Sequence, residues 1–152
     1  MSWLKRLFNR LVNTNSTEEI SNSFNETMQD IRDAGSTAGK HYTDHIETIK
    51  QLKREGKNQE AIVLLLDCVE ATESQSEHAG EGWGVAPWYY EQLAILYRKE
   101  RQFDKEVKIL ERYDSQPKAP GAGPKKLAER LVKARTLLNK HTPPEKMPLN
   151  TK

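Results

Sequence analysis

Two histidines, His41 and His45, stand four residues apart, with Asp44 directly before the second. On a helix this spacing places both imidazoles on one face, where they could bind a metal ion. A zinc-protease motif requires a glutamate directly after the first histidine, and Tyr42 occupies that position. The other two histidines are isolated in the sequence, and no cysteine cluster lies nearby. We therefore predict no metal site and no cofactor, and we keep a metal-dependent enzyme at His41 and His45 only as a distant alternative.

The segment GSTAGKH (residues 35–41) has the glycines and the lysine of a phosphate-binding loop. In a P-loop, four residues separate the two glycines, and a lysine and a hydroxyl residue follow them. Here three residues separate Gly35 from Gly39, and His41 takes the place of the hydroxyl residue. No apolar strand precedes the segment. It is therefore predicted to be a flexible linker.

Nucleophilic catalysis has equally little support. The only cysteine, Cys68, lies in the apolar run AIVLLLDCVE, where a thiol usually serves as a small buried hydrophobe. Nothing in its surroundings gives a reason for a lowered pKa, and no G-x-S-x-G motif occurs in the chain. A single cysteine also excludes an internal disulfide and favours a reducing compartment. We predict that the protein is not an enzyme.

The elements around these residues belong to a chain of 152 residues that is 36% apolar and has a mean hydropathy of −0.84. This length suits one domain, and the low hydropathy predicts that part of the chain is solvated. The charge is uneven: residues 16–48 carry seven acids and two bases, whereas residues 117–152 carry two acids and nine bases. No apolar run reaches the ~20 residues that span a bilayer. The predicted location is the cytoplasm, with peripheral membrane contact left open.

The N-terminal sequence MSWLKRLFNRLVN predicts an amphipathic anchor helix. Its apolar residues share one helical face and are Trp3, Leu4, Leu7, Phe8 and Leu11. The basic residues Lys5, Arg6 and Arg10 lie elsewhere on the helix. We expect this helix to dock on protein, and two alternatives stay open: an interfacial helix on an acidic membrane, and an organelle presequence.

A second helix is predicted from a capping signature, Ser16 followed three residues later by Glu19, to the vicinity of Gly35. Five further helices are expected at residues 41–55, 58–74, 87–100, 103–115 and 124–139. The glycine-rich residues 75–86 are predicted to form a loop. Trp83 in this loop is expected to cap the core, with ligand binding as the alternative.

The helix predicted at residues 87–100 carries Tyr90, Leu93, Ala94 and Tyr97 at the spacing of the first helix of a tetratricopeptide repeat (TPR). A fainter match lies around Gly56, Ala61 and Leu65. The chain therefore resembles the TPR family over residues 42–139. The resemblance implies an all-α fold with two antiparallel TPR-like hairpins and a C-terminal capping helix, preceded by one or two amphipathic helices.

On this basis the chain divides into three parts. Residues 1–40 form an amphipathic and acidic N-terminal segment with a flexible linker, residues 41–140 form the TPR-like domain, and residues 141–152 form a disordered tail. Two hairpins are few, because repeat units bury their faces against neighbours. The last helix is expected to seal one end. The apolar stripe of the second helix, or a second copy of the protein, would seal the other.

Glu106 departs from the repeat pattern, because it occupies the position of a small residue where two helices should touch. A buried carboxylate requires a positively charged partner. The neighbourhood is rich in arginine, so we predict a structural ion pair with Arg98, Arg101 or Arg130. No partner or pocket for a catalytic carboxylate can be named.

The resemblance implies that the first helix of each hairpin lines a groove. The matching positions in the second hairpin are Trp88, Glu91, Ile95, Arg98 and Lys99, and those in the first are Ile46, Lys50, Lys53 and Arg54. A cationic surface with an aromatic residue suits an acidic or amphipathic peptide. The alternative is that these charges are simply a solvated face. Ile46 and Lys50 do not reproduce the carboxylate-clamp pattern of the family, so that specificity is not transferred.

These features predict a non-enzymatic protein–protein interaction module, an adaptor or regulatory subunit, whose N-terminal helix serves as an anchor. The competing prediction is a peripheral nucleic-acid-binding protein that uses the basic C-terminal segment. Its cations are Lys118, Lys125, Lys126, Arg130, Lys133, Arg135 and Lys140. The aromatic residues that would stack on bases lie elsewhere, so this prediction ranks second.

Overall fold

The computed structural model describes residues 3–11 and 17–143. The helices are α1 (Trp3–Leu11), α2 (Thr17–Ala34), α3 (Ile46–Arg54), α4 (Asn58–Ala79), α5 (Pro87–Lys99), α6 (Phe103–Asp114) and α7 (Gly123–His141). Between α2 and α3 lie two short strands, β1 (Ser36–Thr37) and β2 (Lys40–His41), and a 3-10 turn, η1 (Tyr42–His45). The all-α prediction is confirmed.

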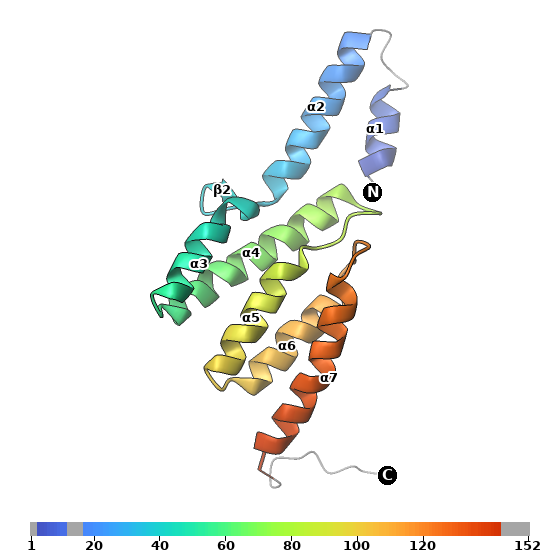
Figure 1. The fold of residues 1–152 in the computed structure, drawn as a ribbon. Helices are drawn as coiled ribbons and strands as arrows, with labels where there is room; N and C mark the ends of the chain where they lie inside the picture. The colour runs from blue at the N-terminus through green and yellow to red at the C-terminus, as the bar shows by residue number, and fades with distance from the viewer. Residues whose placement is uncertain (1–2, 12–16, 144–152) are drawn as a thin grey trace, which may run out of the picture.

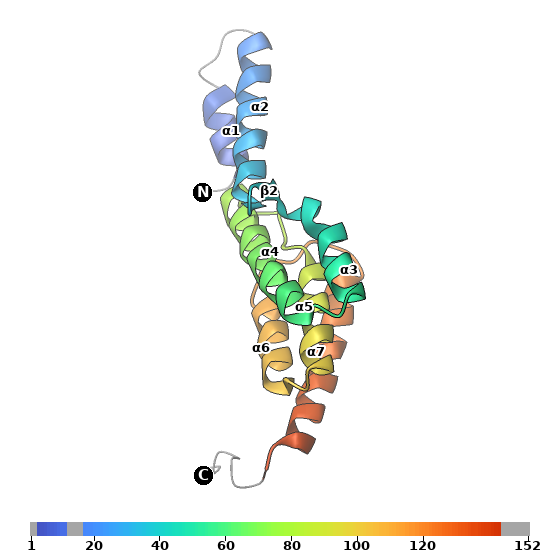
Figure 2. The ribbon, with the colours of Figure 1, turned by 90° about the vertical axis from the view of Figure 1, so that its left-hand side faces the viewer.

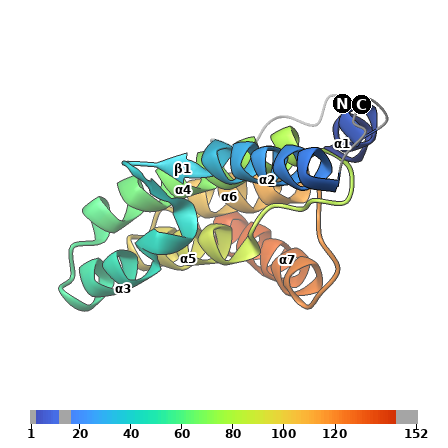
Figure 3. The same ribbon diagram turned by 90° about the horizontal axis from the view of Figure 1, so that it is seen from above.

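The helices of the body form two layers (Figure 3). One layer contains α3, α5 and α7, and the other contains α4 and α6 with α2 beside them. Each helix packs on the next along the chain from α3 to α7, and α5 also contacts α7. The α1–α2 pair lies at the end of the molecule where α2 packs on α4 (Figures 1 and 2). Successive helical hairpins are therefore stacked side by side.

The helix boundaries follow local chemistry. Pro87 occupies the first position of α5, where its missing N–H needs no partner. Gly56 has φ +71°, a left-handed conformation suited to glycine, and it directly follows Glu55, the C-cap residue of α3. The predicted loop at residues 75–86 is wrong at its start, because α4 continues to Ala79. Gln75, Ser76 and Ala79 are buried there, so tertiary packing extends the helix beyond its apolar run.

The predicted linker at residues 35–41 is a β-hairpin rather than an irregular connection. Ser36 pairs with His41, and Thr37 pairs with Lys40. Ala38 and Gly39 both have positive φ values, 49° and 78°, as in the tight turns that join antiparallel strands. β1 also contacts α4, a tertiary contact that composition alone does not predict.

The core is continuous from α3 to α7. It contains the positions that carry the repeat resemblance, Tyr90, Leu93, Ala94 and Tyr97, all of which are buried. Cys68 is fully buried, which confirms its predicted role as a small hydrophobe. Burial raises the pKa of the Cys68 thiol to about 12. The last helix adds Leu127, Leu131 and Ala134 to the same core.

Only the second half of the apolar stripe of α2 reaches this core. Ile31 is buried and Met28 is half-buried, whereas Ile20 and Phe24 are exposed. The predicted capping residue Ser16 lies outside the described residues. The predicted disordered tail, residues 141–152, lies outside them from residue 144 onwards.

Candidate partner-binding surface

One side of α5 carries a stripe of side chains that are not fully buried, although Trp88 among them packs against the core. Trp88, Gln92, Ile95 and Lys99 follow at intervals of four, three and four residues, so they lie along one line of the helix. The first three are half-buried and Lys99 is exposed. The Trp88 ring meets the Tyr89 ring edge-on at 5.1 Å between centroids. We call this stripe, together with Lys53 of α3, the α5 surface.

Lys53 reaches across from α3 to α5, where its ammonium group donates a hydrogen bond to the Gln92 side-chain oxygen. Burial is the first cause that lowers the pKa of Lys53, and the positive charge of Lys99 is the second. The negative charge of Glu91 raises the pKa of Lys53. Among the described residues, no acid forms an ion pair with Lys53 or Lys99. Two cations from successive hairpins therefore act on each other, and Glu91 offsets part of their charge without forming an ion pair with either.

Glu91 and Arg98, which were predicted to bind a partner, lie on the side of α5 that faces α7 and α6. The Glu91 carboxylate is 2.6 Å from Nζ of Lys126 in α7. Arg98 forms a bidentate ion pair with Glu106 of α6, with distances of 2.7 and 3.0 Å. Both side chains therefore hold the protein's own helices together.

Glu106 is fully buried, with an exposed fraction of 0%. Besides Arg98 it contacts Arg130 of α7 at 3.2 Å. The predicted structural ion pair is confirmed for these two arginines. Arg101 does not take part, and its guanidinium group lies over the Phe103 ring at 5.5 Å from the centroid. A single carboxylate thus joins α5, α6 and α7.

The remaining cations predicted in the first hairpin are held by neighbours on α3 itself. Lys50 pairs with Glu47 at 2.9 Å, and Arg54 donates two hydrogen bonds to Gln51. Ile46 is half-buried and packs against the core. Of the first-hairpin positions, Lys53 is the one that a hydrogen bond joins to α5.

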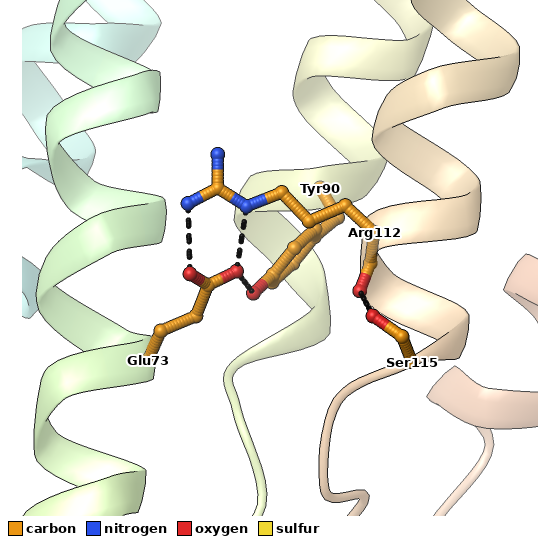
Figure 4. A network of polar contacts seen from close by, with 4 residues as sticks. All are labelled: Glu73, Tyr90, Arg112 and Ser115. Atoms are coloured by element: carbon orange, nitrogen blue, oxygen red, sulfur yellow. Dashed lines mark hydrogen bonds and ion pairs between the residues drawn. The ribbon is translucent and has the colours of Figure 1, made fainter.

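A second carboxylate network, which was not predicted from the sequence, joins α4, α5 and α6 (Figure 4). Glu73 of α4 accepts a hydrogen bond of 2.7 Å from the Tyr90 hydroxyl and two, of 2.8 and 2.7 Å, from Arg112 of α6. Ser115 donates to the Arg112 carbonyl oxygen at 2.8 Å. Pairing with Glu73 is the main cause that raises the pKa of Arg112. The feature of the sequence that could have indicated this network is Tyr90, because the hydroxyl group of a buried tyrosine needs a hydrogen-bond partner.

The anchor helix α1 packs on α2. Leu4 and Phe8 are 55% and 66% exposed, and Leu7 is half-buried. The side chains of Trp3 and Leu11 lie outside the described residues. In the part of the chain that the structure describes, no helix is both long and apolar enough to cross a membrane.

The two histidines considered for metal binding make separate hydrogen bonds. His45 Nε2 lies 2.8 Å from the Thr37 carbonyl oxygen, so this nitrogen donates to the backbone. His41 Nδ1 lies 2.8 Å from the Thr43 hydroxyl. Among residues 3–11 and 17–143, no group of three or more histidine, cysteine, aspartate or glutamate side chains is arranged to hold a metal ion.

Comparison with protein-family models, with curated protein sequences and with solved structures finds no match for this chain.

Proposed function

We propose that the protein is a non-enzymatic interaction module that binds an acidic or amphipathic segment of a partner protein on the α5 surface. The observation that carries this proposal is that Lys53 and Lys99 act on each other while, among the described residues, no acid forms an ion pair with either. Bringing two like charges together is unfavourable unless an anion joins them. A carboxylate from a partner would supply that anion.

The rest of the α5 surface suits a peptide chain. Trp88 and Ile95 offer apolar contacts on the same line as the two lysines, and Gln92 offers an amide. Aromatic residues flanked by cations are common energetic centres of protein interfaces. The adaptor role and the TPR-like mode of binding rest on this surface and on the stacked hairpins.

The competing proposal, a nucleic-acid-binding protein, loses support from the ion pairs of the C-terminal segment. Lys126 is paired with Glu91, Arg130 with Glu106, and Arg135 with Glu111. Counterion release at phosphates requires cations that are free to approach the backbone. Three of the seven cations considered for that role are partly neutralised by the protein itself.

The N-terminal helix is proposed as an anchor. Leu4 and Phe8 are exposed on α1, and Lys5 is exposed beside them. Apolar side chains next to cations suit an interface with a partner protein or with a membrane that contains acidic lipids. A cytoplasmic protein with peripheral attachment is the location proposed from this arrangement.

The test compares Lys53→Glu/Lys99→Glu with the unaltered protein and with Lys108→Glu, an exposed position on α6 in the other layer. The probe is a short fluorescein-labelled peptide in which glutamates alternate with leucines, and anisotropy is measured. We expect the double variant to weaken binding by at least about tenfold and the control to leave it unchanged. Arg98 is unsuitable for this test, because its replacement would remove one of the two cationic partners of the buried Glu106.

Three results would contradict the proposal: no binding of the glutamate peptide, equal binding of a version with lysine for glutamate, or equal loss in Lys108→Glu. A parallel titration with a single-stranded oligonucleotide tests the competing proposal. Steeply salt-dependent binding that is lost in Lys125→Glu/Lys133→Glu but kept in Lys53→Glu/Lys99→Glu would favour nucleic acid.

A further inference from the structure

A cavity of about 530 Å³ lies away from the α5 surface, where α2, the β-hairpin, α4 and the Trp83 loop meet. Small-molecule sites in proteins are typically about 300–1,000 Å³ in volume, so this space is large enough for a small ligand. The residues that line it are Asn25, Met28, Gln29, Ile31, Arg32, His41, Gln75 and Trp83. Four separate segments therefore line one cavity that is open to solvent on the side of α2.

The polar groups of the cavity are three side-chain amides, one imidazole and one guanidinium group, and the guanidinium group carries a full positive charge. Arg32 extends from α2, and among the described residues no acid forms an ion pair with its guanidinium group. Gln29 is tied to Asp33 of the same helix by a 2.7 Å hydrogen bond. Asn25 lies one turn before Gln29 on the same helix face. An anionic group is the ligand chemistry that the Arg32 guanidinium group recognises.

The opposite wall is built from buried polar side chains. His41 and Gln75 are both more than nine-tenths buried. Thr43 N–H donates to His41 Nδ1 at 3.4 Å, so Nε2 is the nitrogen that carries hydrogen in the neutral ring. Nε2 has no hydrogen-bond partner of good geometry among the described residues, although the Gln75 amide lies beside it. A buried donor in this state is costly and is satisfied by an added acceptor.

The positive charge of Arg32 influences the protonation of His41. Burial is the main cause that lowers the pKa of His41, and the positive charge of Arg32 lowers it further. The side-chain amide of Gln75 in α4 and the negative charge of Asp44 in η1 raise the pKa of His41. Arg32 and His41 both line the cavity, and the Arg32 charge acts on the His41 ring. An anion between them would pair with the Arg32 guanidinium group and accept a hydrogen bond from Nε2–H of the neutral His41 ring.

The apolar part of the lining comes from Met28, Ile31 and Trp83. Ile31 is buried, and the other two are half-buried. The Trp83 backbone is held in place by Ser76, whose hydroxyl donates to its carbonyl oxygen at 2.7 Å. A flexible thioether and a flat aromatic ring in the lining of one cavity suit an apolar body rather than a bare ion.

We propose that this cavity binds a small organic anion, with its carboxylate or phosphate group at Arg32 and its apolar body against Met28 and Trp83. The site is independent of the α5 surface and of the proposed partner binding. It lies where α2 joins the body, so an occupied cavity would add contacts between α2 and α4. The anionic group is the shared feature of both ligand classes, and the experiment separates them.

The test uses the full chain and four probes of similar shape: benzoate, phenyl phosphate, neutral benzamide and cationic benzylamine. Binding is followed by the NMR chemical shifts of the Trp83 indole N–H and the Gln75 side-chain amide. We expect the anions to shift both signals in a saturable way, and the neutral and cationic probes to bind at least about tenfold more weakly. Comparing benzoate with phenyl phosphate distinguishes a carboxylate site from a phosphate site.

Two variants and a matched control sharpen the test. Arg32→Gln removes the charge at an exposed helical position and should weaken anion binding by at least about tenfold. Lys40→Gln removes an exposed cation from the neighbouring hairpin without altering the cavity lining, and should leave binding unchanged. Asn25→Trp fills the cavity from an exposed position and should abolish saturable shifts. Equal binding of all four probes, or unchanged binding in Arg32→Gln, would overturn the proposal, as would the absence of any saturable shift.

The pH dependence gives an independent readout. An anion beside His41 favours its protonated form, so bound ligand should raise the pKa of His41. Affinity for benzoate is therefore expected to increase as the pH falls through the range in which His41 is protonated. The charged groups that act on this ring are Arg32 and Asp44. The same titration in His41→Gln should show no such increase, and an unchanged pH profile in this variant would contradict the placement of the anion.

Discussion

Two carboxylates, Glu73 and Glu106, hold the stacked helices together in different ways. Glu73 links α4 to Tyr90 of α5 and to Arg112 of α6. Glu106 links α6 to Arg98 of α5 and to Arg130 of α7. Each carboxylate therefore joins three helices, at neighbouring steps of the stack. The Glu73 side chain is 20% exposed, whereas that of Glu106 is 0% exposed.

Because the two carboxylates differ in exposure, they differ in how far their stability depends on protein partners. A carboxylate with access to water can be solvated when a partner is lost. A carboxylate without such access depends entirely on its protein partners, and an unpaired buried charge is strongly destabilising. We therefore expect the Glu106 site to be the more sensitive of the two, although Glu73 makes more hydrogen bonds with good geometry.

The largest effect is expected for Arg98→Ala/Arg130→Ala, which leaves the Glu106 carboxylate buried without a cation. Loss of the partners of a buried charge costs about 3–5 kcal/mol of unfolding free energy. Urea denaturation followed by circular dichroism measures the change. Adding Glu106→Met in the same background removes the buried charge and should restore most of the stability. If the triple variant is no more stable than the double variant, buried charge is not the cause.

A smaller loss is expected for Arg112→Ala at the other carboxylate. Glu73 would keep the Tyr90 hydroxyl and gain contact with water, so the cost should be about 1–3 kcal/mol. The same urea experiment compares this variant with the previous one. A loss as large as that of Arg98→Ala/Arg130→Ala would show that exposure does not distinguish the two sites.

Tyr90→Phe removes one hydrogen bond from Glu73 and keeps the packing of the ring. The expected loss near neutral pH is about 1 kcal/mol, typical of a hydrogen bond to a half-buried acceptor. Thermal unfolding at neutral pH measures it. An unchanged or increased melting temperature would mean that water replaces the hydroxyl at no cost.

The two sites are expected to respond differently to alkaline pH. The Glu73 site contains a tyrosine hydroxyl group, whereas the Glu106 site contains only carboxylate and guanidinium groups. Burial, followed by the hydrogen bond to Glu73, raises the pKa of Tyr90. Above the ordinary tyrosine pKa of about 10, the unfolded chain loses this proton and the folded chain keeps it, so stability falls as the pH rises. Below that pH the contribution is fully present.

Urea midpoints at about pH 8 and about pH 10.5 test this sign. The unaltered protein should lose more stability between the two values than Tyr90→Phe does. Cys68 and Tyr89 also have raised pKa values and contribute equally to both proteins, so the difference isolates Tyr90. Equal losses in the two proteins would show that Tyr90 ionises with a similar pKa in both states.

The smallest effect is expected at the surface. Arg135 and Glu111 join α6 and α7 at 3.1 Å, but both side chains are about half exposed. Exposed ion pairs of this kind contribute about 0–1 kcal/mol, so Glu111→Ala should change the urea midpoint only slightly. A loss comparable with that of Arg112→Ala would mean that exposure is a poor guide to the importance of ion pairs in this protein.

Much of the fold could be predicted from the sequence. The helix at residues 87–100 was found within one residue of its observed end, because Pro87 and the spacing of Tyr90, Leu93 and Tyr97 are local signals. The ion pair of Glu106 was also predicted, because a charged residue at a small-residue position needs a cation. By contrast, the hairpin at residues 35–41 and the last turn of α4 could not be predicted, since both depend on packing against distant segments.

The candidate binding residues were predicted less well. The sequence placed Arg98 and Glu91 on the binding surface because they follow the helical repeat, yet both side chains pair with residues of α6 and α7. Gln92 was overlooked, although it receives the hydrogen bond from Lys53. Spacing along a helix tells which residues share a face, but not which neighbouring helix that face meets.

By itself, the sequence determined which segments become helices and which side chains point inwards, because helix formation and apolar periodicity act between residues three and four apart. Only the tertiary structure decided which charges are neutralised. Residues 73 and 112 are 39 positions apart, and their pairing depends on how α4 and α6 approach each other. Electrostatic partners are chosen by distance and burial in space, and these arise only when the helices pack.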